Sequence, residues 1–151
     1  MKYILSGFIL LNKLDPSGLT YMPQAAVAIV KGQALFDDGN GFVTNVGTAF
    51  AATFLGVAAY DSDNSGGSAG DINIGFIPPL PHYKFWVKNE SATVAAATDR
   101  GEIVDLESND GIDVTDTTVT AWGFLIEEVD ISTAAVAAAT GGFVKGHFIK
   151  A

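Results

Sequence analysis

The 151-residue sequence contains no cysteine, a single arginine (Arg100) and no apolar run of the roughly 20 residues needed to span a bilayer as a helix. The lack of cysteine excludes a disulfide scaffold, thiol redox chemistry and a cysteine-ligated zinc site. One guanidinium leaves little capacity for planar recognition of phosphates. Lys and Arg number 8 against 17 Asp and Glu, so the formal net charge is −9 and contact with nucleic-acid phosphates begins with repulsion. We therefore expect neither a nucleic-acid nor a membrane partner.

The N-terminus carries the most apolar short segment of the chain. One lysine followed by apolar residues resembles the start of a signal peptide, which stays open as an alternative, but Ser6 and Gly7 interrupt the run and no small-x-small cleavage site follows. We interpret residues 1–23 as an N-terminal arm or strand that docks on a partner by adding to an exposed sheet edge. Its removal up to Leu14 is expected to leave the body folded. The predicted partner-binding side chains are Tyr3, Ile4, Leu5, Phe8, Ile9, Leu10 and Leu11.

Short β-type segments separated by turn residues make up the remainder of the chain. Residues 102–107 and 111–115 alternate apolar and polar side chains, a pattern typical of strands with one face on a core. Asp110-Gly111 between them predicts a hairpin, and residues 39–41 predict another between 33–36 and 42–46. The alanine-rich stretches 92–97 and 134–139 are too short for stable isolated helices. The sequence therefore predicts an all-β fold.

An internal repeat divides this pattern into two units. Matching segments occur in the same order in residues 24–77 and 92–149, and three glycines in the first unit have counterparts in the second: Gly32 with Gly101, Gly56 with Gly123, and Gly75 with Gly146. Residues 78–91 form a proline-rich linker followed by an opening strand, because three prolines among residues 78–81 remove amide donors and stiffen the chain. We expect Gly56 and Gly123 to occupy related strand positions, each with a large apolar side chain against its backbone.

The order of these segments resembles that of bacteriophage head decoration, or cement, proteins with small β-barrel or β-tulip folds. The resemblance rests on Gly-(Gln/Glu)-x-(Leu/Val) at 32–35 and 101–104, on Leu55-Gly56-Val57 and Trp122-Gly123-Phe124, and on the closing segments 72–77 and 143–149. It implies two repeated β-barrel or β-tulip-like units with an extended N-terminal arm. It also implies a non-enzymatic structural protein that binds the major capsid protein on the exterior of the virion, as a homo-oligomer and most often a trimer.

Other features could carry chemistry. Residues 61–66 (Asp-Ser-Asp-Asn-Ser-Gly) match the first half of a calcium loop, but Ile72 stands where the bidentate glutamate belongs. Acidic residues between Asp99 and Asp130, including Glu102, Asp105, Glu107 and Asp113, are expected on a solvated face of alternating strands. His82 and His147 are the only histidines, and neither belongs to a recognisable catalytic motif. We predict no catalytic residue, no metal ligand and no cofactor. An extracellular carbohydrate-binding β module is the alternative, and it would show coplanar exposed aromatic rings and calcium.

Overall fold

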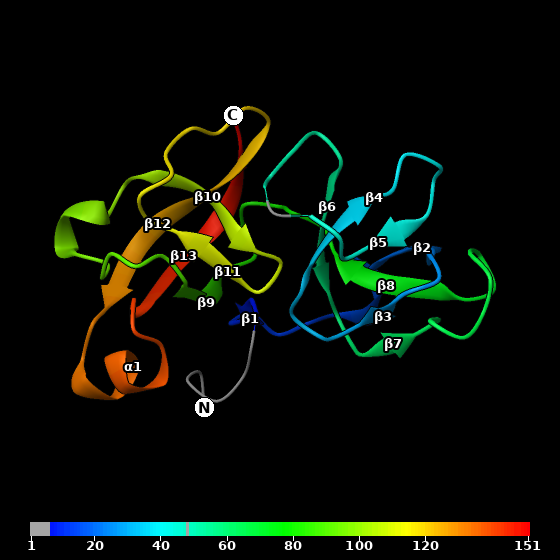
Figure 1. Ribbon diagram of the computed structural model, residues 1–151, viewed down its shortest axis with the longest axis horizontal. Helices are drawn as coiled ribbons and strands as arrows, with labels where there is room; N and C mark the ends of the chain where they lie inside the picture. The colour runs from blue at the N-terminus through cyan, green and yellow to red at the C-terminus, as the bar shows by residue number, and fades with distance from the viewer. Residues whose placement is uncertain (1–6, 48) are drawn as a thin grey trace.

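Two β lobes lie side by side in the computed structural model, which describes residues 7–47 and 49–151 (Figure 1). The C-terminal lobe is a closed five-stranded barrel in which all pairings are antiparallel except that between β9 and β11. Its strands are β9 (Phe85–Asn89), β10 (Ile103–Ser108), β11 (Gly111–Asp113), β12 (Trp122–Asp130) and β13 (Phe143–Lys150). Closure leaves this lobe without a free sheet edge, which removes the usual route to edge-to-edge aggregation.

The N-terminal lobe is built on a five-stranded sheet with the order β2-β8-β6-β4-β5. Its strands are β2 (Thr20–Pro23), β4 (Ala34–Asp37), β5 (Val43–Thr44), β6 (Phe54–Ala58) and β8 (Asn73–Ile77). Adjacent strands are antiparallel, and an isolated parallel bridge from Gln24 to Val43 connects the two ends of the sheet. The barrel has the same sequence of pairings, with β9, β13, β12, β10 and β11 in place of β2, β8, β6, β4 and β5.

Short elements complete the fold. The segment β1 (Ile9–Leu10) pairs with β9, and β3 (Ala28–Ile29) pairs with β7 (Ser62–Asp63). The described helices are η1 (Pro16–Gly18), η2 (Ala97–Asp99) and α1 (Thr133–Ala138). The helix α1 spans six residues and is capped by the Ser132 hydroxyl, which accepts from the N–H of Ala135. Strands dominate the described residues, which confirms the expectation of a β protein.

Both predicted hairpins form, and the local side chains explain their turns. Between β4 and β5 the Asp37 and Asp38 carboxylates accept backbone N–H groups of the turn, while Gly39 and Gly41 supply positive φ angles of 89° and 86°. Between β10 and β11 the turn is centred one residue earlier than Asp110-Gly111 suggests, because Ser108 pairs directly with Gly111.

The sheets extend into segments that the sequence assigned elsewhere. β2 lies within the predicted arm (1–23), and it pairs with β8 over four residues. β9 lies within residues 78–91, where the sequence predicts an opening strand after the proline-rich linker, and in the barrel it contacts both β13 and β11. Long-range pairing therefore recruits strands that have no clear alternation of their own.

Phenylalanine rings join the two lobes. The ring of Phe148, on β13, has its centroid 4.9–5.4 Å from those of five other rings. Two of these five come from barrel strands and three from outside the barrel: Phe85, Phe124, Phe8, Phe50 and Phe54. Each of the six is at most 4% exposed. We call these six residues the phenylalanine cluster, and it makes the barrel core continuous with one face of the N-terminal sheet.

The position of Phe8 differs from the expectation of a partner-binding side chain. It is 3% exposed, and its N–H donates to the carbonyl of Gly32 at 2.8 Å. Ile9 and Leu10 are half-buried in the β1–β9 pair, whereas Leu11 is 45% exposed. Residues 7–10 therefore belong to the body of this chain, because they fill the space between its lobes. Tyr3, Ile4 and Leu5 lie outside the described residues.

Replacing Phe148 with alanine should destabilise the whole chain by about 3–5 kcal/mol, because it leaves a cavity at the point where five buried rings meet. Urea unfolding followed by near- and far-UV circular dichroism measures this loss. Val46→Ala is the matched control, since Val46 is 75% exposed, and it should change stability by less than about 0.5 kcal/mol. An equal effect of both variants would contradict the role of the cluster.

The two strand glycines should respond differently to alanine. A Cβ on Gly56 would lie 2.1 Å from the carbonyl oxygen of Ile77, and the φ of Gly56 is +146°. A Cβ on Gly123 would meet the Ile103 methyl Cγ2 at 2.4 Å, in agreement with the expected apolar neighbour, and that side chain can shift. Gly56→Ala should therefore cost about 1–3 kcal/mol more than Gly123→Ala. Thermal unfolding of both variants tests the difference, and equal losses would exclude the backbone clash at Gly56.

Candidate functional site

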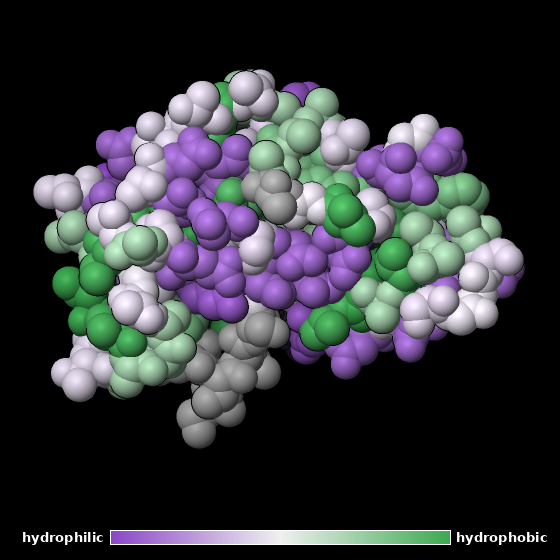
Figure 2. Space-filling view, viewed as in Figure 1, coloured by the Kyte–Doolittle hydropathy of each residue, from purple (hydrophilic) through white to green (hydrophobic). Residues whose placement is uncertain are grey.

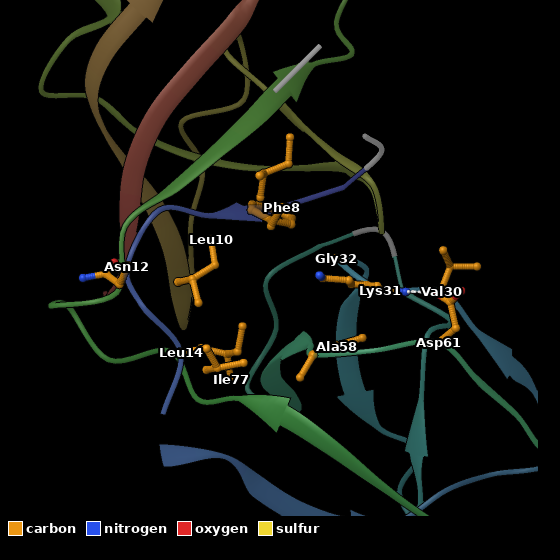
Figure 3. A pocket seen from close by; sticks show the side chains of 12 residues that line it. Phe8, Leu10, Asn12, Leu14, Val30, Lys31, Gly32, Ala58, Asp61 and Ile77 are labelled. Atoms are coloured by element: carbon orange, nitrogen blue, oxygen red, sulfur yellow. Dashed lines mark hydrogen bonds between the residues drawn. The ribbon is translucent and has the colours of Figure 1, made fainter. Parts of the chain in front are cut away.

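A groove of about 590 Å³ runs between the N-terminal segment and the edge of the N-terminal sheet (Figure 3). Its walls are mostly apolar and come from the N-terminal segment and from the N-terminal lobe: Phe8, Leu10, Leu14, Val30, Ala58 and Ile77. Three polar side chains lie at its border: Asn12, Lys31 and Asp61. The volume lies within the range of small-molecule and peptide sites.

The polar groups at this border hold the chain rather than converge on a common point. The Asn12 amide donates to the carbonyl of His82 at 3.0 Å and accepts from the N–H of Lys84 at 2.7 Å. The Asp61 carboxylate accepts the backbone N–H of Lys31 at 2.8 Å. The groove is consequently suited to apolar contact and not to acid–base chemistry, which needs two titratable groups aimed at one reacting centre.

β1 presents a backbone edge toward the groove. The N–H of Leu11 donates to the carbonyl of Lys84 on the β9 side, whereas the N–H of Phe8 donates to Gly32 on the opposite side. Successive residues of a strand direct their N–H and C=O groups to alternate sides, so those of Leu10 point away from β9. An extended segment in the groove could pair with this edge.

A charged cluster lies on the barrel surface at the junction of β9, β12 and β13. The ammonium of Lys84 contacts the Glu127 carboxylate at 2.5 Å, and His147 Nδ1 lies against the same carboxylate oxygen. Lys84 Nζ is 3.0 Å from His147 Nδ1. Partial burial raises the pKa of the Glu127 carboxyl. Hydrogen bonds and charge from Lys84 and His147 lower this pKa by a larger amount, so it lies below the usual value. Sequence reasoning does not predict this cluster, because Lys84, Glu127 and His147 are far apart along the chain.

The loop that resembles half of a calcium site is organised by its own hydrogen bonds. Asp63 accepts from the N–H of Ser65 at 2.9 Å, and the Asn64 amide is buried and donates to three backbone carbonyls. Its carboxylates thereby close local turns. Within residues 7–47 and 49–151, no three His, Asp or Glu side chains are grouped so as to hold a metal ion.

Asp105 departs from the expected solvated face. Glu102 and Glu107 are exposed and Asp113 is half-buried, whereas Asp105 is only 8% exposed. Its carboxylate accepts the N–H of Phe50 at 2.5 Å and that of Leu106 at 2.8 Å. It therefore ties the loop that carries Phe50 to β10. His82, the other histidine, stacks beside Tyr83 with ring centroids 4.2 Å apart.

Glu127→Gln should destabilise the chain at pH 7 but not at low pH. The folded-state pKa of Glu127 is depressed, so the carboxylate contributes stability above its unfolded pKa, and this contribution is lost as the pH falls through the folded pKa. The urea midpoints of wild type and Glu127→Gln should differ at pH 7, and this difference should shrink as the pH falls below the ordinary glutamate pKa of about 4.3. Glu102→Gln, at an exposed carboxylate, is the control. A difference that persists unchanged at pH 3 would contradict the assignment.

Among the helices within residues 7–47 and 49–151, none has the length and apolar character needed to cross a bilayer. A scan of the chain against protein-family models and a search of curated proteins each found no match.

Proposed function

We propose that this chain is a non-enzymatic structural protein that decorates the exterior of an assembled phage capsid and stabilises it. In this proposal it consists of two repeated β units, its N-terminal arm contributes to attachment, the major capsid protein is its partner, and it acts as a homo-oligomer, with a trimer favoured. The observation that carries the proposal is the matched hydrogen-bond frame of the two lobes.

The end of the first strand is held in the same way in both lobes. After β2, the N–H of Gln24 donates to the carbonyl of Ile72 at 2.9 Å. At the end of β9, the N–H of Asn89 donates to the carbonyl of Gly142 at 3.0 Å. Both side-chain amides are fully buried, and each donates to one carbonyl in the loop that follows its strand and to one in a distant segment: Val27 and Ser62 for Gln24, and Thr93 and Gly141 for Asn89. Two polar residues buried for the same purpose at the same place support a common origin of the lobes.

The start of the second strand is matched as well. The N–H of Gly32 donates to the carbonyl of Ala58 at 2.9 Å, and its φ is +90°. The N–H of Gly101 donates to the carbonyl of Ile126 at 2.7 Å, and its φ is +89°. A shared left-handed glycine before corresponding strands is a specific backbone requirement and not a consequence of composition.

This frame refines the alignment of the repeat. Gly32 aligns with Gly101, as the sequence suggests. Gly56 lies on the strand that corresponds to that of Gly123, and Gly75 on the strand that corresponds to that of Gly146. The pair Ala58–Phe76 in the first lobe corresponds to the pair Ile126–Gly146 in the barrel. Each glycine is therefore one residue away from the position of its expected counterpart. The glycines therefore mark the repeat only approximately.

A tandem of two like units fits a partner that is itself repetitive. A capsid surface presents many copies of one subunit at fixed spacings, and the phenylalanine cluster holds the two units together through one continuous core. Two linked contacts bind far more tightly than either alone when their spacing matches the sites. The net charge of −9 accords with a protein partner rather than nucleic acid.

In this proposal the arm attaches through Tyr3, Ile4, Leu5 and the exposed Leu11, while a segment of the capsid protein adds to the edge of β1 in the apolar groove. Phe8, Ile9 and Leu10 then act as the wall of the contact. The groove and the open edge of Leu10 support this mode, because main-chain pairing and apolar pockets together are how extended segments are bound.

Cosedimentation with phage heads that lack the protein tests the proposal, and wild type should pellet with them. Leu11→Asp should weaken attachment at least about tenfold, because it places a carboxylate in an apolar contact. Leu80→Asp is the matched control, since Leu80 is 44% exposed and Leu11 45%. Failure of wild type to pellet would refute the capsid function, whereas full attachment of Leu11→Asp would refute only the role of the arm.

A further inference from the structure

Two exposed tyrosines lie over one glycine of β8. The glycine pairs with β2 in the N-terminal lobe (Figure 1). Tyr21 lies directly opposite Gly75 in the sheet register. A Cβ on Gly75 would lie 2.8 Å from Tyr21 Cε1 and 3.1 Å from Tyr60 Cε1, so both rings occupy the space that a side chain would fill. Tyr21 is 55% exposed and Tyr60 is 38% exposed. We call Tyr21, Tyr60 and Gly75 the tyrosine platform.

A hydrogen bond fixes the ring of Tyr60, and both tyrosine hydroxyls keep a proton to donate to a ligand. The Tyr60 hydroxyl accepts the backbone N–H of Gly75 at 2.7 Å, so its own proton is free to be donated outward. The Tyr21 hydroxyl has no hydrogen-bond partner among residues 7–47 and 49–151. Asn73 is exposed two residues from Gly75, hence on the same face of β8, and it adds an amide.

The barrel shows that the fold does not require this platform. The β9–β13 pair of the barrel corresponds to the β2–β8 pair. Trp86 lies opposite Lys145 there, at the positions that Tyr21 and Gly75 hold in the N-terminal lobe. Glu128 pairs with Lys145 from the other side, and their charged groups are 3.3 Å apart. In the barrel this position of the fold therefore carries a lysine in an ion pair. In the N-terminal lobe it carries a glycine, and two tyrosine rings lie over it.

The strands of the platform are uncharged, and the carboxylate of Asp61, which follows Tyr60, is engaged by the backbone N–H of Lys31. Neither β2 nor β8 contains an acidic or basic residue, although the chain has 25 of them, Lys, Arg, Asp and Glu together. Exposed aromatic faces with hydroxyl and amide groups at their borders suit a ligand that has an apolar C–H face and neutral hydroxyls at its edge. A pyranose ring has this chemistry, whereas an anionic ligand would meet a protein of net charge −9.

We propose that the tyrosine platform is a binding site for a neutral saccharide, with one sugar ring stacked across Tyr21 and Tyr60 and its hydroxyls bonded to the tyrosine hydroxyls and Asn73. This site adjoins the groove beside β1, since Ala59, Asp61 and Ile77 line the groove, but it shares no lining residue with it and does not depend on capsid attachment. Binding through a few exposed contacts is expected in the millimolar to high-micromolar range.

NMR titration of the full chain with cellotetraose, maltotetraose and triacetylchitotriose tests the site. At least one of these should shift the amide signals of Gly75 and its neighbours in a saturable manner. Tyr21→Ala should weaken binding at least about tenfold, and Gly75→Lys should abolish it, because a Cβ there displaces both rings. The barrel carries Lys145 at the corresponding place, so Gly75→Lys is expected to remain folded, as circular dichroism can verify.

Trp86→Ala is the matched control, since it removes the aromatic ring at the corresponding position of the barrel, and it should leave binding unchanged. The proposal is overturned if none of the three saccharides produces a saturable shift at about 10 mM, a concentration at which a millimolar site is mostly occupied. It is also overturned if folded Tyr21→Ala or Gly75→Lys binds as wild type does.

Discussion

The packing of five phenylalanine rings around Phe148 is the interaction on which the remainder of the structure depends. Barrel strands supply three of these six rings, the N-terminal segment supplies one, and the region of Phe50 and Phe54 supplies two. Edge-to-face and tilted aromatic contacts add directional preference to the burial of large apolar surface. The cluster thus fixes the position of one lobe on the other, and it determines where the groove beside β1 lies. Asp105 contributes a polar restraint, because its buried carboxylate holds the loop that carries Phe50.

The two lobes share a hydrogen-bond frame but differ in the surfaces they build on it. The frame depends on backbone groups and on the buried amides of Gln24 and Asn89, which tolerate few alternatives. The outer positions are free to vary. One lobe has tyrosines around a bare glycine there, and the other has the ion pair of Lys145 with Glu128 and the nearby cluster of Lys84, Glu127 and His147. A shared frame with different outer residues lets one chain carry two different surfaces.

Local sequence signals predicted the local structure well. The turn residues of both hairpins reflect interactions between near neighbours, and both hairpins form, the second with its turn one residue earlier than predicted. The strand over residues 103–108 also forms, but Asp105 is buried where a solvated side chain was expected. The sequence could not reveal that β2 belongs to the first sheet, since its pairing with β8 joins residues about fifty positions apart. Phe8 was misassigned for the same reason. An apolar residue near a terminus has the same composition signal whether it meets a partner or the core of its own chain. The tyrosine platform was also invisible, because it depends on the register that brings Tyr21 opposite Gly75.

The contact between Phe8 and Phe148 has a consequence for how the chain acquires its structure. Their ring centroids are 5.2 Å apart, although almost the whole described sequence separates the two residues. Contacts of such long sequence separation form late, because the loop they close carries a large entropic cost. During translation, β13 leaves the ribosome after every other described strand, so the N-terminal segment must wait with its apolar side chains uncovered until that strand arrives. Final consolidation of the core therefore waits for β13, and slow or stalled translation before that strand exposes the N-terminal segment to chaperones or to neighbouring nascent chains.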